Sequence, residues 1–187
     1  MFDVDGNTDF LRPITKDELF TTLKAFSKDK SPGPDGWTIE FIIHCYELLK
    51  LDLIQMVEEA RLSGRIHQKT SSTLIALIPK KGDAESFHDF RPISLCNISF
   101  KIISKIIAER LKPTIASFIS LDQHAFLRGR NILDVVAITQ EVMFLMKTKS
   151  IDVAILNVDL QKAYDCLEWG FLRCLLAKIG LNPQAID

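Results

Sequence analysis

The feature that most constrains the fold is the apolar run Val153-Ala154-Ile155-Leu156, because a short continuous run of this kind is typical of a buried strand. The run leads through Asn157 and Val158 to Asp159, and Tyr164 follows five positions later. A carboxylate at the end of a buried strand could bind the divalent cations that assist nucleotidyl transfer. A lone aspartate after a strand is more commonly a helix N-cap or a turn residue. Spacing alone leaves both interpretations open.

Length and composition indicate an ordinary globular protein. The chain has 187 residues, 47% of them hydrophobic and 25% charged, which fits one compact domain. The four cysteines and four histidines are scattered and form no CxxC pair, so we expect no zinc site and reduced thiols. No apolar run approaches the roughly 18 residues that span a bilayer. The sequence therefore predicts an intracellular protein, nuclear or cytoplasmic, without a membrane partner.

The net charge of −1 conceals three blocks of different sign. Residues 1–60 carry 6 basic and 12 acidic side chains, residues 61–112 carry 10 and 4, and residues 113–187 carry 7 and 8. The local balances are therefore −6, +6 and −1. The basic middle block is either a solvated face with lysines at helical spacing or a patch that faces phosphates.

Periodicity, caps and turn residues predict a mostly helical chain with a small sheet. A capping box, Thr15 to Glu18, begins the first helix, and Ser31–Gly36 forms a rigid turn. The remaining boundaries are set largely by Gly64, Pro113 and Gly180, each of which we expect to end a helix. We expect helices at about 15–28, 38–62, 97–111, 133–147 and 169–179, and strands at 72–79, 90–95 and 152–158.

The first two strands would form a hairpin with a basic tip. Lys80 and Lys81 lie in its turn, and Arg91 lies on its return strand beside a proline. Such a group could bind a triphosphate, because arginine offers bidentate donors and lysine a mobile point charge. An ordinary exposed hairpin would carry the same residues, so the pattern alone does not decide.

Five motifs in order give the chain a family resemblance. The chain resembles the reverse transcriptases of non-LTR retrotransposons, and most of all those of the plant long interspersed element type. The motifs are SPGPDG (31–36), ALIPKKGD (76–83), FRPISL (90–95), QHAFLRGRNILD (123–134) and NVDLQKAYDCLEW (157–169).

The resemblance implies an α+β right-hand polymerase fold, mostly helical with a small antiparallel sheet. Residues 1–187 would be a partial reverse transcriptase domain, with the fingers at about 1–150 and the start of the palm at about 151–187. By resemblance, Asp159 is the first catalytic aspartate and a magnesium ligand, and the Leu160 carbonyl is a neighbouring metal and nucleotide contact. Tyr164 corresponds to a steric gate that excludes the ribose 2′-hydroxyl.

The same resemblance assigns binding roles to residues before the palm. Arg91 and a lysine of the Lys80-Lys81 pair would hold the incoming triphosphate. Gln123, Gly129 and Arg130 match a motif near the template path, within which Ala125 stands where the family commonly has glycine. The implied partners are an RNA template, a DNA primer and a dNTP.

No paired aspartate motif follows Asp159 in this sequence. The family activity would be RNA-directed DNA synthesis, but we expect this polypeptide alone, truncated before the paired aspartates, to be inactive. The alternatives are a non-catalytic module that binds RNA or an RNA/DNA hybrid, and a decayed remnant.

Overall fold

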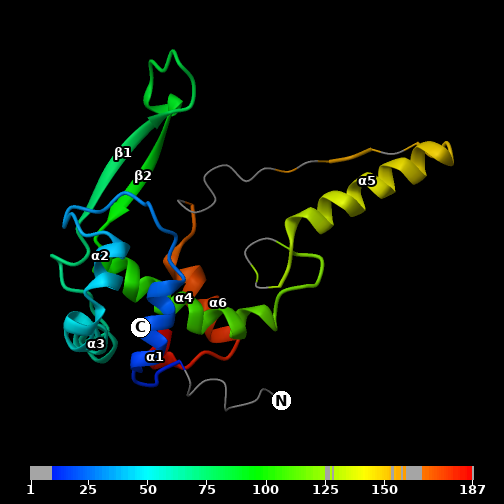
Figure 1. Cartoon of the computed structure of the whole chain (residues 1–187). Helices are drawn as coiled ribbons and strands as arrows, with labels where there is room; N and C mark the ends of the chain where they lie inside the picture. Colours follow the sequence, from blue (N-terminus) through cyan, green and yellow to red (C-terminus); the bar gives the residue numbers. More distant parts are fainter. Residues whose placement is uncertain are drawn as a thin grey trace. The chain divides into compact units, whose positions relative to one another are not determined.

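A computed structural model describes residues 10–124, 127, 129–152, 154–156, 158 and 166–186. The chain forms two compact units. Figure 1 labels its helices and strands. The first, here called the N-terminal unit, spans Thr8–Arg110, and the second, the C-terminal unit, contains the chain from Leu111 onward. Each unit is described by itself.

The N-terminal unit consists of helices and one β-hairpin. Its helices are α1 (Lys16–Lys24), α2 (Ile39–His44), α3 (Tyr46–Ser63) and most of α4 (Ile98–Ala116). The hairpin is formed by β1 (Thr73–Pro79) and β2 (Phe90–Cys96), with the short 3-10 helix η2 (Phe87–Asp89) in its tip. The predicted mostly helical chain with a small antiparallel sheet is confirmed.

The core of this unit lies among the four helices. Leu19, Leu23 and Ile102 are fully buried at its centre. Burying side chains of this size stabilises the fold by roughly 1.5–3 kcal/mol each. The cluster of buried residues comprises Ile14, Leu19, Leu23, Ile39, Ile42, Tyr46, Leu53, Val57, Ile98, Ile102, Ile103 and Ile106.

At the start of α1, one of the two hydrogen bonds of the predicted capping box is present. The hydroxyl of Thr15 accepts from the Glu18 amide at 3.1 Å, but the Glu18 side chain binds arginine instead of returning to the cap. The helix ends at Lys24 and not near Lys28, because the amides of Ala25 and Phe26 turn back to carbonyls three residues earlier. The chain then passes through a positive φ of 56° at Asp29.

The single helix predicted over 38–62 is wrong, because the chain breaks at Cys45. This residue ends α2 and precedes α3, with φ −91° and ψ 13°. Next to the break, Tyr46 is buried and its hydroxyl donates to the Lys16 carbonyl at 3.0 Å. Its ring packs against that of Phe20, with the ring centroids 4.7 Å apart. We attribute the break to this packing, which periodicity does not reveal. Gly64, with φ 63°, ends α3 as predicted.

The hairpin projects from the helices (green, Figure 1). Its register runs from Thr73 opposite Cys96 to Pro79 opposite Phe90, which confirms both predicted strands. Apolar side chains on both of its faces are exposed, and it contributes none to the buried cluster. The hairpin therefore depends on its ladder and on its base for its position.

Helix α4 corrects a second boundary. It continues through Pro113 to Ala116, whereas we expected Pro113 to punctuate its end. A proline there removes one intrahelical hydrogen bond close to the helix end, where the last carbonyls already lack intrahelical partners.

The C-terminal unit carries three further helices. Asn131 caps α5 (Ile132–Thr148) by accepting from the Leu133 amide at 3.0 Å, and α6 (Trp169–Lys178) and α7 (Pro183–Ile186) follow. The helices predicted at 133–147 and 169–179 are confirmed within a residue or two. Among the described residues, no helix is both long and apolar enough to cross a membrane.

The strand predicted over 152–158 is not found in its described part. Residues 152, 154–156 and 158 have no strand assignment, and Leu156 is 87% exposed. A strand needs a neighbouring backbone, and the two strands of the described chain pair with each other. The apolar run supplies strand propensity, but no described strand is left to pair with it.

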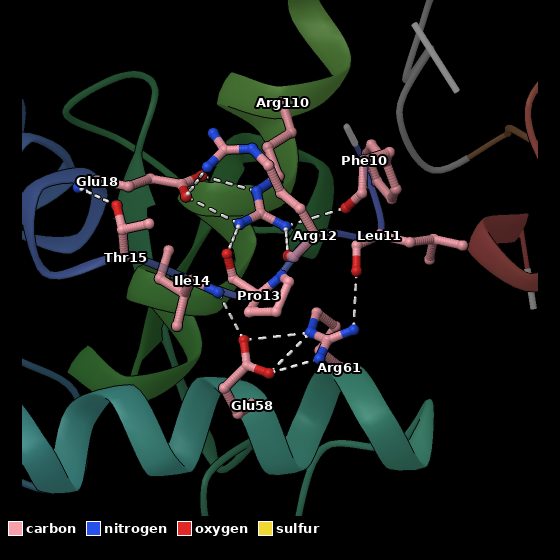
Figure 2. Close-up of polar contacts among 10 residues, drawn as sticks. All are labelled: Phe10, Leu11, Arg12, Pro13, Ile14, Thr15, Glu18, Glu58, Arg61 and Arg110. Atoms are coloured by element: carbon pink, nitrogen blue, oxygen red, sulfur yellow. Dashed lines mark hydrogen bonds and ion pairs between the residues drawn. The ribbon is translucent and has the colours of Figure 1, made fainter. Parts of the chain in front are cut away.

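Two arginines fasten the segment before α1 to the helices of the N-terminal unit (Figure 2). Arg110 on α4 donates to both oxygens of Glu18, at 2.7 and 2.8 Å, and to the carbonyls of Phe10, Arg12 and Pro13. Arg12 approaches the same carboxylate at 3.2 Å. Burial is the largest single influence on the pKa of Glu18 and raises it, but the hydrogen bonds and charge of Arg110, the charge of Arg12 and the Thr15 hydrogen bond together hold this pKa below its usual value.

A second pair on α3 holds the same segment (Figure 2). Arg61 binds Glu58 and donates to the Leu11 carbonyl at 2.8 Å, while Glu58 accepts from the Ile14 amide at 2.7 Å. The hydrogen bonds from Arg61, together with that amide, lower the pKa of Glu58 despite its partial burial. Both carboxylates therefore favour the folded state as anions.

Candidate functional site

The hairpin brings Lys80 and Arg91 to one end of one face. Arg91 lies opposite Ile78 in the ladder, and the Lys80 amide donates to the Asp89 carbonyl at 2.7 Å, which extends the ladder by one pair. Strand β1 ends at Pro79; continuing its alternation of side chains by one residue puts Lys80 on the face of Ile78 and Arg91, and Lys81 on the other. Diagonal neighbours of this kind lie roughly 7–8 Å apart at Cα, within reach of long side chains.

The two lysines differ in their partners. The Lys80 ammonium donates to the His88 carbonyl at 2.6 Å, and the Lys81 ammonium pairs with Asp89 at 3.3 Å. Arg91 is exposed, and its guanidinium makes no hydrogen bond or ion pair with any residue that the structure describes. Arg91 is thus the readiest of these cations to bind an anion.

Asp89 organises the tip, and sequence reasoning missed it. One of its carboxylate oxygens accepts from the Glu85 amide at 3.2 Å, the Ser86 amide at 3.1 Å and the Ser86 hydroxyl at 3.3 Å. The Ser86 amide is the main cause of a lowered pKa of Asp89, to which Lys81 also contributes. The sequence pattern that could have revealed Asp89 is the Ser86-x-x-Asp89 spacing, which forms a capping box around η2.

Charge at the tip is more balanced than the basic block suggested. Residues 80–91 contain three cations, Lys80, Lys81 and Arg91, and three carboxylates, Asp83, Glu85 and Asp89. In the pair of Lys81 with Asp89 the lysine is exposed and the aspartate half-buried, so exchanging Asp89 for a phosphate would cost Lys81 about 1 kcal/mol. The tip can therefore offer its cations to a ligand without losing its fold.

The predicted metal and gate residues lie outside the described part of the chain. These are Asp159, Leu160 and Tyr164. Among the residues that are described, no three His, Cys, Asp or Glu side chains gather into a metal-binding group. The assignments of these three residues stay predictions.

The three residues of the predicted template motif lie in one loop of the C-terminal unit. The Arg130 guanidinium donates to the carbonyls of Ile119, Ser120 and Gln123, and Gly129 adopts a φ of 77°. These bonds fold the loop back on itself. Arg130 therefore acts first on the conformation of the loop, and its predicted contact with nucleic acid stays a prediction.

Comparison with known proteins gives a family match. The family model described as reverse transcriptase (RNA-dependent DNA polymerase) matches residues 78–187. The match begins at the end of β1 and includes the tip of the hairpin, all of β2 and the segment around Asp159.

Curated relatives come from mobile elements. The Transposon TX1 uncharacterized 149 kDa protein of Xenopus laevis is 33% identical over 93% of this chain. The Retrovirus-related Pol polyproteins from the type-1 element R2 of Popillia japonica and the type-2 element R2DM of Drosophila melanogaster are 24% and 26% identical over 91% and 93%. The chain spans only 13%, 23% and 16% of these three proteins.

Proposed function

Because this chain belongs to the reverse transcriptase (RNA-dependent DNA polymerase) family, we propose that it supplies the nucleotide-binding hairpin and the first metal-binding carboxylate for RNA-templated DNA synthesis. The substrates are an incoming dNTP and an RNA template with a DNA primer. The names of the relatives support an origin in a non-LTR retrotransposon, and the motifs favour the plant long interspersed element type. A protein of this kind acts inside the cell, in the nucleus or cytoplasm.

The observation that supports the proposal most is that Lys80 and Arg91 lie at the same end of the hairpin, with Arg91 opposite Ile78 and the Lys80 amide bonded to the Asp89 carbonyl. A triphosphate needs several cationic donors that reach it from one side, and a guanidinium can bind two of its oxygens at once. Arg91 makes no bond to a described side chain that it would have to give up. The Lys80 ammonium exchanges one carbonyl for a phosphate oxygen.

The proposed chemistry at Asp159 follows from the same family assignment. Magnesium, when bound, offsets the negative charge that develops on phosphate oxygens. The carboxylate of Asp159 and the carbonyl of Leu160 are hard oxygen ligands of the type that magnesium prefers. The ring of Tyr164 would lie against the sugar and leave no room for a 2′-hydroxyl.

Nucleotide cross-linking to the purified chain tests the hairpin. A photoreactive dNTP is irradiated with the protein, an RNA/DNA template–primer and magnesium, and the labelled fraction is measured against nucleotide concentration. Losing one charged hydrogen-bonding group costs about 1.5–3 kcal/mol, so Arg91→Ala and Lys80→Ala should each weaken labelling by roughly 10–100-fold. Equal labelling of Arg91→Ala and wild type would refute the assignment.

Lys50→Ala is the matched control, because Lys50 is a cation on α3 of the same unit and pairs with Glu47 at 2.5 Å. It should label like wild type. Asp159→Ala should remove the magnesium dependence of labelling while leaving salt-sensitive binding of the RNA/DNA hybrid intact. Hybrid binding without any nucleotide labelling would favour the non-catalytic binding module.

Catalysis itself is tested by primer extension. We expect none from these 187 residues, because one predicted carboxylate cannot replace a full set of metal ligands. Incorporation by the purified chain that disappears in Asp159→Ala would overturn that expectation.

A further inference from the structure

The proposed function leaves the Ser31–Gly36 motif without a role. In the structure this segment is a tight turn, closed by a hydrogen bond of 3.0 Å from the Gly36 amide to the Gly33 carbonyl. Pro34 and Asp35 occupy its central positions, and Gly36 has a φ of 71°. The turn is therefore rigid, and what it contacts becomes informative.

Asp35 binds the point where β2 ends and α4 begins. One oxygen of its carboxylate accepts from the Ile98 amide at 2.9 Å, which caps the first turn of α4. Its own amide donates to the Asn97 side-chain oxygen at 3.0 Å. This is an N-cap supplied from 63 residues away.

Asn97 connects the same point to the start of the hairpin. Its side-chain amide donates to the Lys69 carbonyl at 2.9 Å, and its backbone amide donates to the Ser72 carbonyl at 3.4 Å. Thr73 begins β1 directly afterwards, and Cys96 ends β2 directly before. Asn97 is 7% exposed, so these bonds are shielded from water. Both strands are thus held at their base.

Gly33 fits against the end of β2 so closely that no side chain could be added. A Cβ at this position would lie 2.3 Å from the Cys96 carbonyl oxygen and 2.6 Å from the Asn97 nitrogen. Both are backbone atoms, which cannot rotate away as a side chain could. The close approach requires glycine.

We propose that Gly33, Asp35 and Asn97 form a base lock that sets the direction of the hairpin and so positions Lys80 and Arg91. The effect of the lock on nucleotide binding rests on the proposed function. The contacts that form the lock do not depend on it. Its members are positioning residues: they contact the base of the hairpin and not the nucleotide.

The need for such a lock follows from the length of the hairpin. Seven residues at about 3.3 Å each make strands of roughly 23 Å, so a tilt of about 10° at the base moves the tip by roughly 4 Å. Misplacing a substrate-positioning group by only about 1 Å can cost on the order of 100-fold in rate. The hairpin buries no side chain in the core that could resist the tilt.

Distance measurement between spin labels tests the lock without a nucleotide. Ketone-bearing amino acids at Leu48 on α3 and Asp83 in the tip, both exposed, accept the labels and leave the four cysteines untouched. Asp35→Ala should broaden the distance distribution by about 4 Å or more. Asp35→Asn, which keeps an oxygen for the Ile98 amide, should restore much of the narrow distribution.

The matched control is Asp52→Ala, which removes an exposed carboxylate from α3 in the same unit. A distribution for Asp35→Ala as narrow as that of Asp52→Ala would overturn the lock. Should Asp35→Ala fail to fold, Asn97→Asp decides, because it keeps the acceptor for the Asp35 amide but turns a carboxylate oxygen toward the Lys69 carbonyl and adds a negative charge beside Asp35. A narrow distribution in folded Asn97→Asp would equally overturn it.

Cross-linking separates the lock from the proposed function. Folded lock variants should label with dNTP at least tenfold less than Asp52→Ala, although Lys80 and Arg91 are intact. Broadened distances in a chain whose wild type never labels would uphold the lock and refute the nucleotide site. Unchanged labelling together with narrow distances would refute the lock alone.

Discussion

Replacing Arg110 with alanine is the severest test of how the N-terminal unit holds together. The Arg110 side chain is 8% exposed, and the Glu18 carboxylate that it binds is 16% exposed. Removing one partner of a shielded pair leaves the other charge without its counterpart, and this commonly costs 3–5 kcal/mol. Three backbone carbonyls also lose a donor.

The structure places the expected value near the lower end of that range. Arg12 approaches Glu18 at 3.2 Å and would still compensate part of its charge. We therefore expect Arg110→Ala to lower the free energy of unfolding by about 3 kcal/mol. Arg110→Lys keeps the charge but cannot donate to both carboxylate oxygens and the carbonyls together, so it should recover only part of the loss.

Urea unfolding followed by tryptophan fluorescence measures this change. Trp37 belongs to the N-terminal unit and packs 4.5 Å from Phe41, so a Trp169→Phe background makes the signal specific to this unit. With a denaturant slope of about 1.5 kcal/mol per molar, a loss of 3 kcal/mol lowers the urea midpoint by about 2 M.

The control is Lys50→Ala, which breaks an i,i+3 pair with the exposed Glu47 on α3 and should cost less than about 0.5 kcal/mol. If the midpoint of Arg110→Ala lies within experimental error of that of Lys50→Ala, the reasoning from burial is wrong. Low stability in Arg110→Ala with full recovery in Arg110→Lys would show that charge alone matters, and not the geometry of the guanidinium.

Three further results are expected. The folded pKa of Glu58 lies below its unfolded value of about 4.3, so Glu58 stabilises the fold fully above that pH, and this stabilisation is lost as the pH falls through the folded pKa. Glu58→Gln should therefore reduce the slope of the free energy of unfolding against pH on the acid side. An unchanged slope would contradict this. Asp89→Ala should speed amide hydrogen exchange at Ser86 by tenfold or more, as measured by mass spectrometry, while exchange in α3 stays as in wild type. In a longer, polymerase-active polypeptide, Tyr164→Val should raise ribonucleotide incorporation, and unchanged sugar selectivity in primer extension would retire the gate assignment.

Local signals in the sequence predicted most elements of the fold. The hydroxyl of Thr15 and the glycine at 64 each act on their own few residues, so these helix ends were predicted without tertiary information. Asn131, which we did not name as a cap, acts equally locally. The hairpin was predictable for the same reason, since turn residues separate two runs rich in β-formers.

Features that depend on distant partners were missed. The break at Cys45 accompanies the packing of Tyr46 against α1, which no periodicity within 38–62 reveals. The capping of α4 by Asp35 joins residues 63 positions apart. The described residues of the strand predicted at 152–158 have no strand assignment, because local apolar character does not provide a neighbouring strand.

The candidate site was predictable in identity but not in detail. Sequence could group Lys80, Lys81 and Arg91, but only the structure shows that Arg91 lies opposite Ile78 and that Lys81 pairs with Asp89. The loop role of Arg130 was likewise hidden, since its partners are backbone carbonyls that any residue could provide.

The separation of the hairpin from the buried cluster has a consequence for how such a domain changes over generations. A substitution in the middle of β1 or β2 removes no core packing, so it can alter what the tip recognises with little penalty to folding. Only the residues of the base lock affect both the folding of the unit and the position of the hairpin tip. Variation should therefore accumulate along β1 and β2 and be scarce at Gly33, Asp35 and Asn97.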